Sequence, residues 1–194
     1  MIVCAVPSFA ADTAYGELVA NGDMEFSETS MDSWTGYSMG VGKTGYVAHG
    51  GEVSTKFTRT ESKNSILIQK GEIIGGKDVK ISSWIYTEET GKTAGWRVDF
   101  RDANEQTLKT EFMMFPVTKG KWTEISTTLP SPEGAVFFQI QLRNGEAGTL
   151  CFDDVSMKGE ATLMRIEEVE GINKKGIEVL RHSQELYNAN VAKG

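Results

Sequence analysis

Three segments of the chain alternate apolar and polar residues, and their polar positions carry the side chains best suited to binding a ligand. The segments are residues 79–87, 96–101 and 136–143. A period of two is typical of a β-strand that buries one face. The positions expected to face the core are Val79, Ile81, Ser83, Ile85, Val98, Phe100, Val136, Phe138, Ile140 and Leu142. The outward positions hold the candidate ligand-binding residues Trp84, Tyr86, Arg97, Asp99, Gln139, Gln141 and Arg143.

This outward set combines flat aromatic rings with planar amide, carboxylate and guanidinium groups. Sugar rings present apolar C–H faces and hydroxyl groups, so a surface that binds them needs both kinds of side chain. We expect Trp84 and Tyr86 to stack on sugar rings while the polar members bond the hydroxyls. The alternative is that Arg97, Asp99 and Arg101 form a solvated ladder of charges across neighbouring strands.

The elements that must position these residues are short strands joined by tight turns. The chain has 21 Gly and only four Pro, and further strands are expected over residues 65–69, 111–117, 123–129 and 149–157. Turn-forming pairs such as Gly75-Gly76 and Asn144-Gly145 separate the strands. The sequence therefore predicts an all-β fold, an antiparallel β-sandwich of the jelly-roll kind over residues 12–159.

The last part of the chain has a different character. Residues 163–191 are rich in helix formers, and Ile177, Leu180, Gln184, Tyr187 and Val191 recur at helical spacing. We expect a C-terminal helical extension over residues 160–194, interrupted near its two glycines. It is interpreted as a linker or the start of a further domain, as a strap on the sandwich, or as a coiled-coil partner site.

The first residues are apolar and resemble the second half of a secretory signal peptide. Residues 1–11 end in Ser8-Phe9-Ala10, which places small residues where a signal peptidase requires them. The basic front region of such signals is missing, so an apolar N-terminal strand is the alternative. Removal of the signal would take Cys4 away and leave Cys151 without a disulfide partner. We expect a secreted, extracellular protein.

Length and charge narrow the classes of partner. The 194 residues suffice for one domain with a sizeable core. The 20 Lys and Arg residues against 27 Asp and Glu give a net charge of −7. That sign is wrong for binding nucleic acid or an anionic membrane surface.

Two short stretches at opposite ends of the β region resemble a known family. The first is Leu18-Val-Ala-Asn-Gly-Asp-Met-Glu-Phe26 followed by Asp32-Ser-Trp-Thr-Gly36, and the second is Cys151-Phe-Asp-Asp-Val-Ser-Met157. They resemble the opening and the closing strand of carbohydrate-binding modules of the family 4, 9, 16 and 22 type, which are galactose-binding-domain-like jelly rolls. The resemblance covers residues 16–159. It implies a non-catalytic targeting module of a secreted glycoside hydrolase, with a plant-type polysaccharide such as β-glucan or xylan as ligand and a catalytic domain missing from this chain.

The closing strand also carries a candidate metal ligand. Alternation places Asp153 on one face with Cys151, Val155 and Met157, so this carboxylate shares an apolar side and needs a cation or hydrogen bonds. The resemblance implies a structural calcium ion there and places Glu25 beside the last strand. Calcium prefers such oxygen ligands. Backbone N–H donors to Asp153 are the alternative, as is a second ligand other than Glu25, namely Asp23 or Asp154.

Catalytic chemistry has little support in the sequence. His49 and His182 are the only histidines, and no nucleophile elbow, phosphate loop, dinucleotide fingerprint or zinc-ligand spacing is present. A small glycan-active hydrolase would need paired carboxylates, such as Asp99 with Glu88 or Glu111. A surface or adhesion module of the same fold that binds protein is the other alternative.

Overall fold

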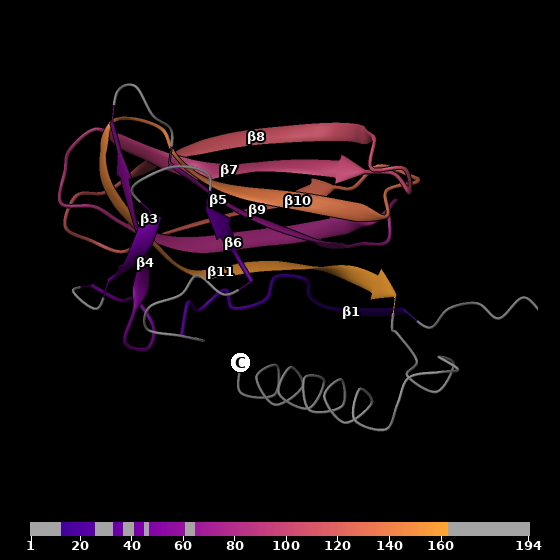
Figure 1. Ribbon diagram of the computed structural model, residues 1–194, viewed down its shortest axis with the longest axis horizontal. Helices are drawn as coiled ribbons and strands as arrows, with labels where there is room; N and C mark the ends of the chain where they lie inside the picture. The colour runs from indigo at the N-terminus through magenta and orange to yellow at the C-terminus, as the bar shows by residue number, and fades with distance from the viewer. Residues whose placement is uncertain (1–12, 26–32, 37–40, 45–46, 61–64, 163–194) are drawn as a thin grey trace, which may run out of the picture. The chain divides into compact units, whose positions relative to one another are not determined.

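The computed structural model describes residues 13–25, 33–36, 41–44, 47–60 and 65–162, and the regular elements among them are all β-strands (Figure 1). The eleven described strands are β1 (Thr13–Glu17), β2 (Thr35–Gly36), β3 (Val41–Thr44), β4 (Ser54–Arg59), β5 (Ile66–Glu72), β6 (Asp78–Tyr86), β7 (Lys92–Arg101), β8 (Thr107–Val117), β9 (Thr123–Pro130), β10 (Phe137–Asn144) and β11 (Gly148–Thr162).

These strands form two sheets. A six-stranded sheet has the order β3-β4-β11-β6-β9, with β1 paired to β11 off this path, and a five-stranded sheet has the order β2-β5-β10-β7-β8. The pairs along the two strand orders, that is, all pairs other than β1 with β11, are antiparallel. The predicted all-β antiparallel sandwich is confirmed.

The core lies between the sheets and takes one side chain in two from their long strands. On β6, Val79, Ile81 and Ile85 are fully buried, and on β10 so are Phe138 and Ile140. Burial of one such side chain contributes roughly 1.5–3 kcal/mol, so several together fix which face of each strand points inward. The predicted inward positions are confirmed except for one. Val136 precedes β10 and is 38% exposed.

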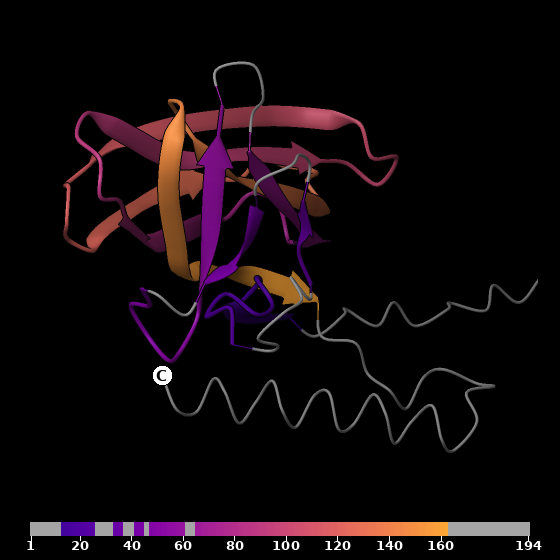
Figure 2. The same cartoon turned by 60° about the vertical axis from the view of Figure 1, so that its left-hand side comes forward.

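Strand β11 departs from simple alternation. Its pairing with β6 shifts register between Asp153 and Ser156, and Asp154 has a φ of 45°. Figure 2 shows β11 running beside β4 and then bending away, as expected of a strand that contains a bulge. Phe152 and Met157 are both core residues, although they are an odd number of positions apart. The prediction that Asp153 shares a face with Val155 and Met157 is therefore wrong, because the bulge reverses the alternation between them.

The predictions for the two ends of the chain fall mostly outside the described residues. The contacts group Tyr15–Ala161 as one compact unit and place Met1–Ala14 with Thr162–Gly194 in a second. The predicted signal peptide over residues 1–11 and the predicted helix over residues 163–191 lie outside the described residues. Within the described part of the chain, no helix has the length and apolar character needed to cross a membrane.

A glycine allows β7 and β8 to approach closely. A Cβ atom at Gly95 would lie 1.9 Å from the carbonyl oxygen of Met113 on the neighbouring strand. Backbone atoms cannot move aside without breaking the ladder, so only glycine fits at this position.

We expect Gly95→Ala to lower the free energy of unfolding by about 1–3 kcal/mol, because the added methyl group would push β8 away from β7. Thermal or urea unfolding measures the change. The matched control is Gly36→Ala, where an added Cβ would meet no atom within 4 Å. Equal stability of the two variants would contradict the close-packing argument.

Candidate functional site

The predicted ligand-binding residues lie on two different sheets. Trp84 and Tyr86 belong to β6 in the six-stranded sheet. The five polar members belong to β7 and β10 in the five-stranded sheet; they are Arg97, Asp99, Gln139, Gln141 and Arg143. The prediction of one shared binding surface is therefore wrong. Alternation identified which side chains point outward, but not which sheet each strand joins.

The five polar residues do lie together on the outer side of the five-stranded sheet, here called the five-stranded face. Strand β10 lies between β5 and β7, so its outward side chains are in register with outward side chains on both neighbours. One cross-strand row runs Ile68, Gln141, Arg97 and Phe112. The next rows run Lys70, Gln139, Asp99 and Thr110, and then Ile66, Arg143, Gly95 and Met114.

Hydrogen bonds fix the polar groups at the centre of this face. Asp99 is buried, and its Oδ1 accepts bonds from Arg97 Nε at 2.9 Å and Thr110 Oγ1 at 2.6 Å. Gln139 Oε1 accepts a bond from Arg101 Nη2 at 3.2 Å. Arg97 and Asp99 thus form an ion pair along β7 with the carboxylate buried, which differs from the alternative of a solvated ladder of charges across neighbouring strands.

The side-chain amide of Gln141 is different. Gln141 is only 7% exposed, and its amide has no hydrogen-bond partner among the residues that the structure describes. The amide is not among the buried atoms without a partner, so it reaches solvent, where a ligand hydroxyl can bond it.

An exposed aromatic ring lies beside these polar groups. Phe112 on β8 is 56% exposed, and the guanidinium of Arg143 lies 5.5 Å from the centre of its ring. Phe112 was not among the candidate residues. It belongs to the apolar run Phe112-Met-Met-Phe115, in which alternation cannot be seen. Only its pairing with Arg97 across the β7–β8 ladder places it on the five-stranded face.

A pocket opens at the Arg143 end of the five-stranded face. Its volume is about 370 Å³, within the range of small-ligand sites. Its lining includes Ile66, Phe112, Met114 and Arg143 from the face. Gly95 lies in register between Arg143 and Met114, so no side chain rises between those two residues.

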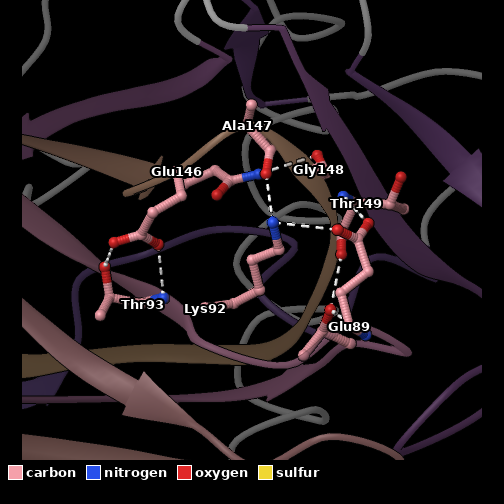
Figure 3. A network of polar contacts seen from close by, with 9 residues as sticks. Glu89, Lys92, Thr93, Glu146, Ala147, Gly148 and Thr149 are labelled. Carbon is pink, nitrogen blue, oxygen red and sulfur yellow. Dashed lines mark hydrogen bonds and ion pairs between the residues drawn. The ribbon is translucent and has the colours of Figure 1, made fainter.

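The hairpin that forms the rim of this pocket is held by a network of polar contacts (Figure 3). Glu146 accepts hydrogen bonds from the backbone N–H and the hydroxyl of Thr93, at 2.7 and 2.8 Å. Lys92 contacts the carboxylate of Glu89 at 2.9 Å and donates to the carbonyl oxygen of Ala147. Glu89 also accepts a bond from the N–H of Thr149 at 2.8 Å. The turn between β10 and β11 is thereby tied to the start of β7.

The charge of Glu89 is part of that network. The hydrogen bond from Lys92, and after it the N–H of Thr149, lower the pKa of the Glu89 carboxyl. The ionised carboxylate is therefore the form of Glu89 that this network favours.

Trp84 and Tyr86 belong instead to an aromatic cluster on the outer side of the six-stranded sheet. The imidazole of His49 stacks on Trp84, with ring centres 3.8 Å apart and planes 12° apart. Trp122 lies edge-on to His49 at 5.6 Å and is 5.5 Å from Tyr86. One face of the Trp84 indole is therefore already covered by a side chain of the protein. Trp122 directly precedes β9, so it packs into this outer cluster from the end of a strand.

Asp153 anchors the loop that carries His49. Its Oδ2 accepts N–H bonds from His49 at 2.8 Å and Gly50 at 3.3 Å, and its Oδ1 accepts one from Asp154 at 2.8 Å. Asp154 in turn contacts His49 Nδ1 at 2.6 Å. Burial raises the pKa of the Asp153 carboxyl to about 7, against the lowering effect of these N–H donors.

The predicted calcium ligands, Glu25 and Asp153, both accept hydrogen bonds from backbone N–H groups. Glu25 Oε1 accepts the N–H groups of Glu52 and Val53, at 2.9 and 2.8 Å, so both carboxylates hold the same loop through backbone donors. An N–H donor and a cation compete for the same lone pairs. Among the described residues, no three His, Cys, Asp or Glu side chains gather closely enough to hold a metal ion. The donor set fits the hydrogen-bonded alternative for Asp153, and calcium at Glu25 and Asp153 stays a prediction.

The carboxylate pairs considered for glycan hydrolysis do not share a face. Glu111 is in register with the inward residue Val98, whereas Asp99 is in register with Thr110. Glu111 also pairs with Lys109 at 2.8 Å. Glu88 follows β6 in the other sheet. Neither pair brackets a ligand on the five-stranded face.

The titration of Asp153 gives an expected pH dependence. Its folded-state pKa of about 7 lies above the ordinary value of 3.8, so its contribution to stability is complete below pH 3.8 and is lost as the pH rises to about 7. We therefore expect the melting temperature of the wild type, measured relative to Asp153→Asn in buffer with EDTA, to fall over that interval. A constant or rising difference would contradict the raised pKa of the Asp153 carboxyl.

The same titration tests calcium. An ion held by Glu25 and Asp153 would favour the carboxylate, raise the melting temperature and reverse the pH slope. A melting temperature that neither EDTA nor added Ca²⁺ changes would contradict the calcium prediction.

Comparison with known proteins identifies the fold. No protein-family model and no curated protein sequence matches the chain. Among solved structures, a family 16 carbohydrate-binding module is similar with a TM-score of 0.56 and 18% identity, over 72% of this chain and 98% of that one. The CBM22-1 xylan-binding domain of Paenibacillus barcinonensis Xyn10C matches with a TM-score of 0.54 and 17% identity, over 80% and 98%.

Parts of two longer proteins have a similar fold. The bacteriophage CBA120 tailspike protein 4 is similar with a TM-score of 0.59 and 16% identity, over 76% of this chain and 21% of that one. The Clostridium thermocellum xylanase 10B CBM22-1-GH10 structure, complexed with xylohexaose, matches with a TM-score of 0.56 and 22% identity, over 71% and 28%. This chain thus corresponds to between a fifth and a third of those two proteins. The described strands form the jelly-roll sandwich of carbohydrate-binding modules, as the sequence resemblance implied.

Proposed function

We propose that the five-stranded face binds a plant-type polysaccharide, xylan in the first instance, and that the chain is a non-catalytic carbohydrate-binding module. The observation that carries the proposal is the cross-strand row Ile68, Gln141, Arg97 and Phe112. In this row, Ile68 and Phe112 lie on either side of two polar groups, the amide of Gln141 and the guanidinium of Arg97.

This row matches the chemistry of a sugar chain. The C–H face of a pyranose packs on Phe112 or Ile68, and its hydroxyl groups can pair with the amide of Gln141. Arg97 is held by Asp99, so its position does not have to be ordered when the ligand binds. Xylan is favoured because modules with this fold are described as xylan-binding.

Binding without catalysis is supported by the absence of a suitable acid and base pair on the described part of this face. Asp99 is occupied by two hydrogen bonds, and its candidate partners Glu88 and Glu111 lie elsewhere. Release of reducing sugar from xylan by the isolated chain would contradict this part of the proposal.

The proposal includes export and attachment to a catalytic domain of a glycoside hydrolase. The Clostridium thermocellum structure joins a module of this fold to a GH10 module in one chain. A tethered module raises the effective concentration of its enzyme on the polysaccharide. We found no contact among the described residues that favours the alternative of an adhesion module that binds protein.

Phe112→Ala provides the test of the binding face. We expect the variant to lose about tenfold in affinity for soluble xylan in affinity electrophoresis, because an exposed ring that stacks on a sugar contributes about 1–1.5 kcal/mol. Truncation of an exposed side chain at the sheet edge should leave the melting temperature nearly unchanged.

Trp84→Ala is the matched control, since this aromatic residue lies on the opposite sheet and is covered by His49. Its retention by xylan should equal that of the wild type. Loss of retention in Trp84→Ala with full retention in Phe112→Ala would move the site to the six-stranded sheet. A wild type that no polysaccharide retards would refute the function.

A further inference from the structure

We propose that the pocket at the Arg143 end of the five-stranded face takes the carboxylate of a uronic acid, so that the preferred ligand is a xylan substituted with glucuronic acid. The inference rests on the proposed function and names the class of polysaccharide. It is carried by three features of the pocket, namely its unpaired positive charge, its unsatisfied polar atoms and its position on the face.

The first feature is the charge of the pocket lining. Two arginines, Arg59 from β4 and Arg143 from β10, line the pocket together with one carboxylate, that of Glu146. Both oxygens of that carboxylate already accept bonds from Thr93. The lining therefore presents an excess of positive charge in a chain whose net charge is −7.

Arg143 has no counter-ion of its own in the described structure. Asp99, the nearest carboxylate on the face, binds Arg97 and Thr110. None of the described Asp or Glu side chains lies within ion-pair distance of Arg143, whose guanidinium contacts the ring of Phe112 instead. A partly buried guanidinium without a carboxylate partner is a binding site for an anion.

The charges around the Arg143 guanidinium also favour an anionic ligand. Burial, and after it the charges of Arg97 and Arg59, lower the pKa of the Arg143 guanidinium. Arg97 and Arg59 are thus both close enough to repel Arg143, and Asp99 acts in the opposite direction. A ligand carboxylate placed at Arg143 would relieve this repulsion, whereas a neutral hydroxyl would not.

The second feature is a pair of buried polar atoms without partners. Asn144 is only 3% exposed, and its Oδ1 has no hydrogen-bond partner in the described structure, although its Nδ2 donates to Gly148 at 3.1 Å. Arg59 donates to the carbonyl oxygens of Asn144 and Gly145, but its buried Nε is unpaired. Arg59 and Asn144 both line the pocket, but these two atoms are buried, and a ligand reaches them only when a lining side chain moves. A sugar acid that enters after such a movement carries hydroxyl donors and carboxylate acceptors that match both atoms.

The third feature is the position of the pocket. It adjoins the row of Gln141, Arg97 and Phe112 that we assign to the sugar chain, because Arg143 and Gln141 are alternate outward residues of β10. A branch on a chain bound along that row would reach the pocket. Its volume of about 370 Å³ accommodates a single sugar unit with room for water.

The test compares two polymers that differ only in their carboxyl groups. One is glucuronoxylan, and the other is the same glucuronoxylan after chemical reduction of its uronic acids to neutral sugars. Isothermal titration calorimetry with the full chain measures the affinity for each at low and at high salt. We expect the wild type to bind the native polymer about tenfold more tightly than the reduced one, and the difference to shrink at high salt.

Arg143→Gln should abolish the difference between the two polymers, and the ratio of the two affinities is the readout, because Arg143 also contacts Phe112 on the binding face. Arg143→Lys should restore part of the difference, because lysine keeps the charge and loses the paired donors. The charge-matched control is Lys80→Gln, on an exposed position of the six-stranded sheet, which should bind both polymers as the wild type does.

The outcomes distinguish a failure of the uronic acid inference from a failure of the proposed function. Equal affinity of the wild type for both polymers overturns the uronic acid inference and leaves the proposed function standing. A preference for the native polymer that Lys80→Gln lowers as much as Arg143→Gln shows attraction by overall charge and also overturns it. Binding of neither polymer overturns the inference together with the proposed function.

Discussion

The site depends on one constraint, which is the position of β10 between β5 and β7. Its residues Phe138, Ile140 and Leu142 are fully buried, and their burial leaves the strand only one way to face. The intervening residues Gln139, Gln141 and Arg143 must then lie on the outer side of the sheet, in register with partners on both neighbours. The packing of the core thus decides which side chains reach the outer face, and hydrogen bonds such as that from Arg97 to Asp99 then fix their positions.

Polar contacts secure a turn on the five-stranded sheet and a loop on the six-stranded sheet, with different consequences for the two outer faces. At one end, the turn that follows β10 is tied to the start of β7 through Glu146, Thr93 and Lys92. Gly145 approaches Thr93 so closely that a Cβ atom would lie 2.1 Å from its hydroxyl oxygen. On the other sheet, Asp153 holds the loop of His49, and the imidazole closes over Trp84. One sheet therefore keeps its outer face open for a ligand, while aromatic side chains of the other sheet contact one another.

Much of the fold could be predicted from the sequence. Alternation identified the long strands and nearly all of their inward residues, because a period of two reports directly on burial. Three features of the structure could not be predicted from alternation. Membership of a sheet depends on long-range pairing, so Trp84 and Arg97 appeared to share a surface. A bulge such as that after Asp153 breaks the period without a sequence signal of its own. Phe112 lies in an unbroken apolar run, where only its partner Arg97 reveals its direction.

The central claim is that the ligand lies on the five-stranded sheet. An NMR titration of the ¹⁵N-labelled chain with xylohexaose tests it most directly, since each backbone amide reports on its own surroundings. The claim requires the largest shifts at the amides of Arg97, Phe112 and Gln141. Shifts concentrated at Trp84, Tyr86 and Trp122, with β7, β8 and β10 unaffected, would contradict it.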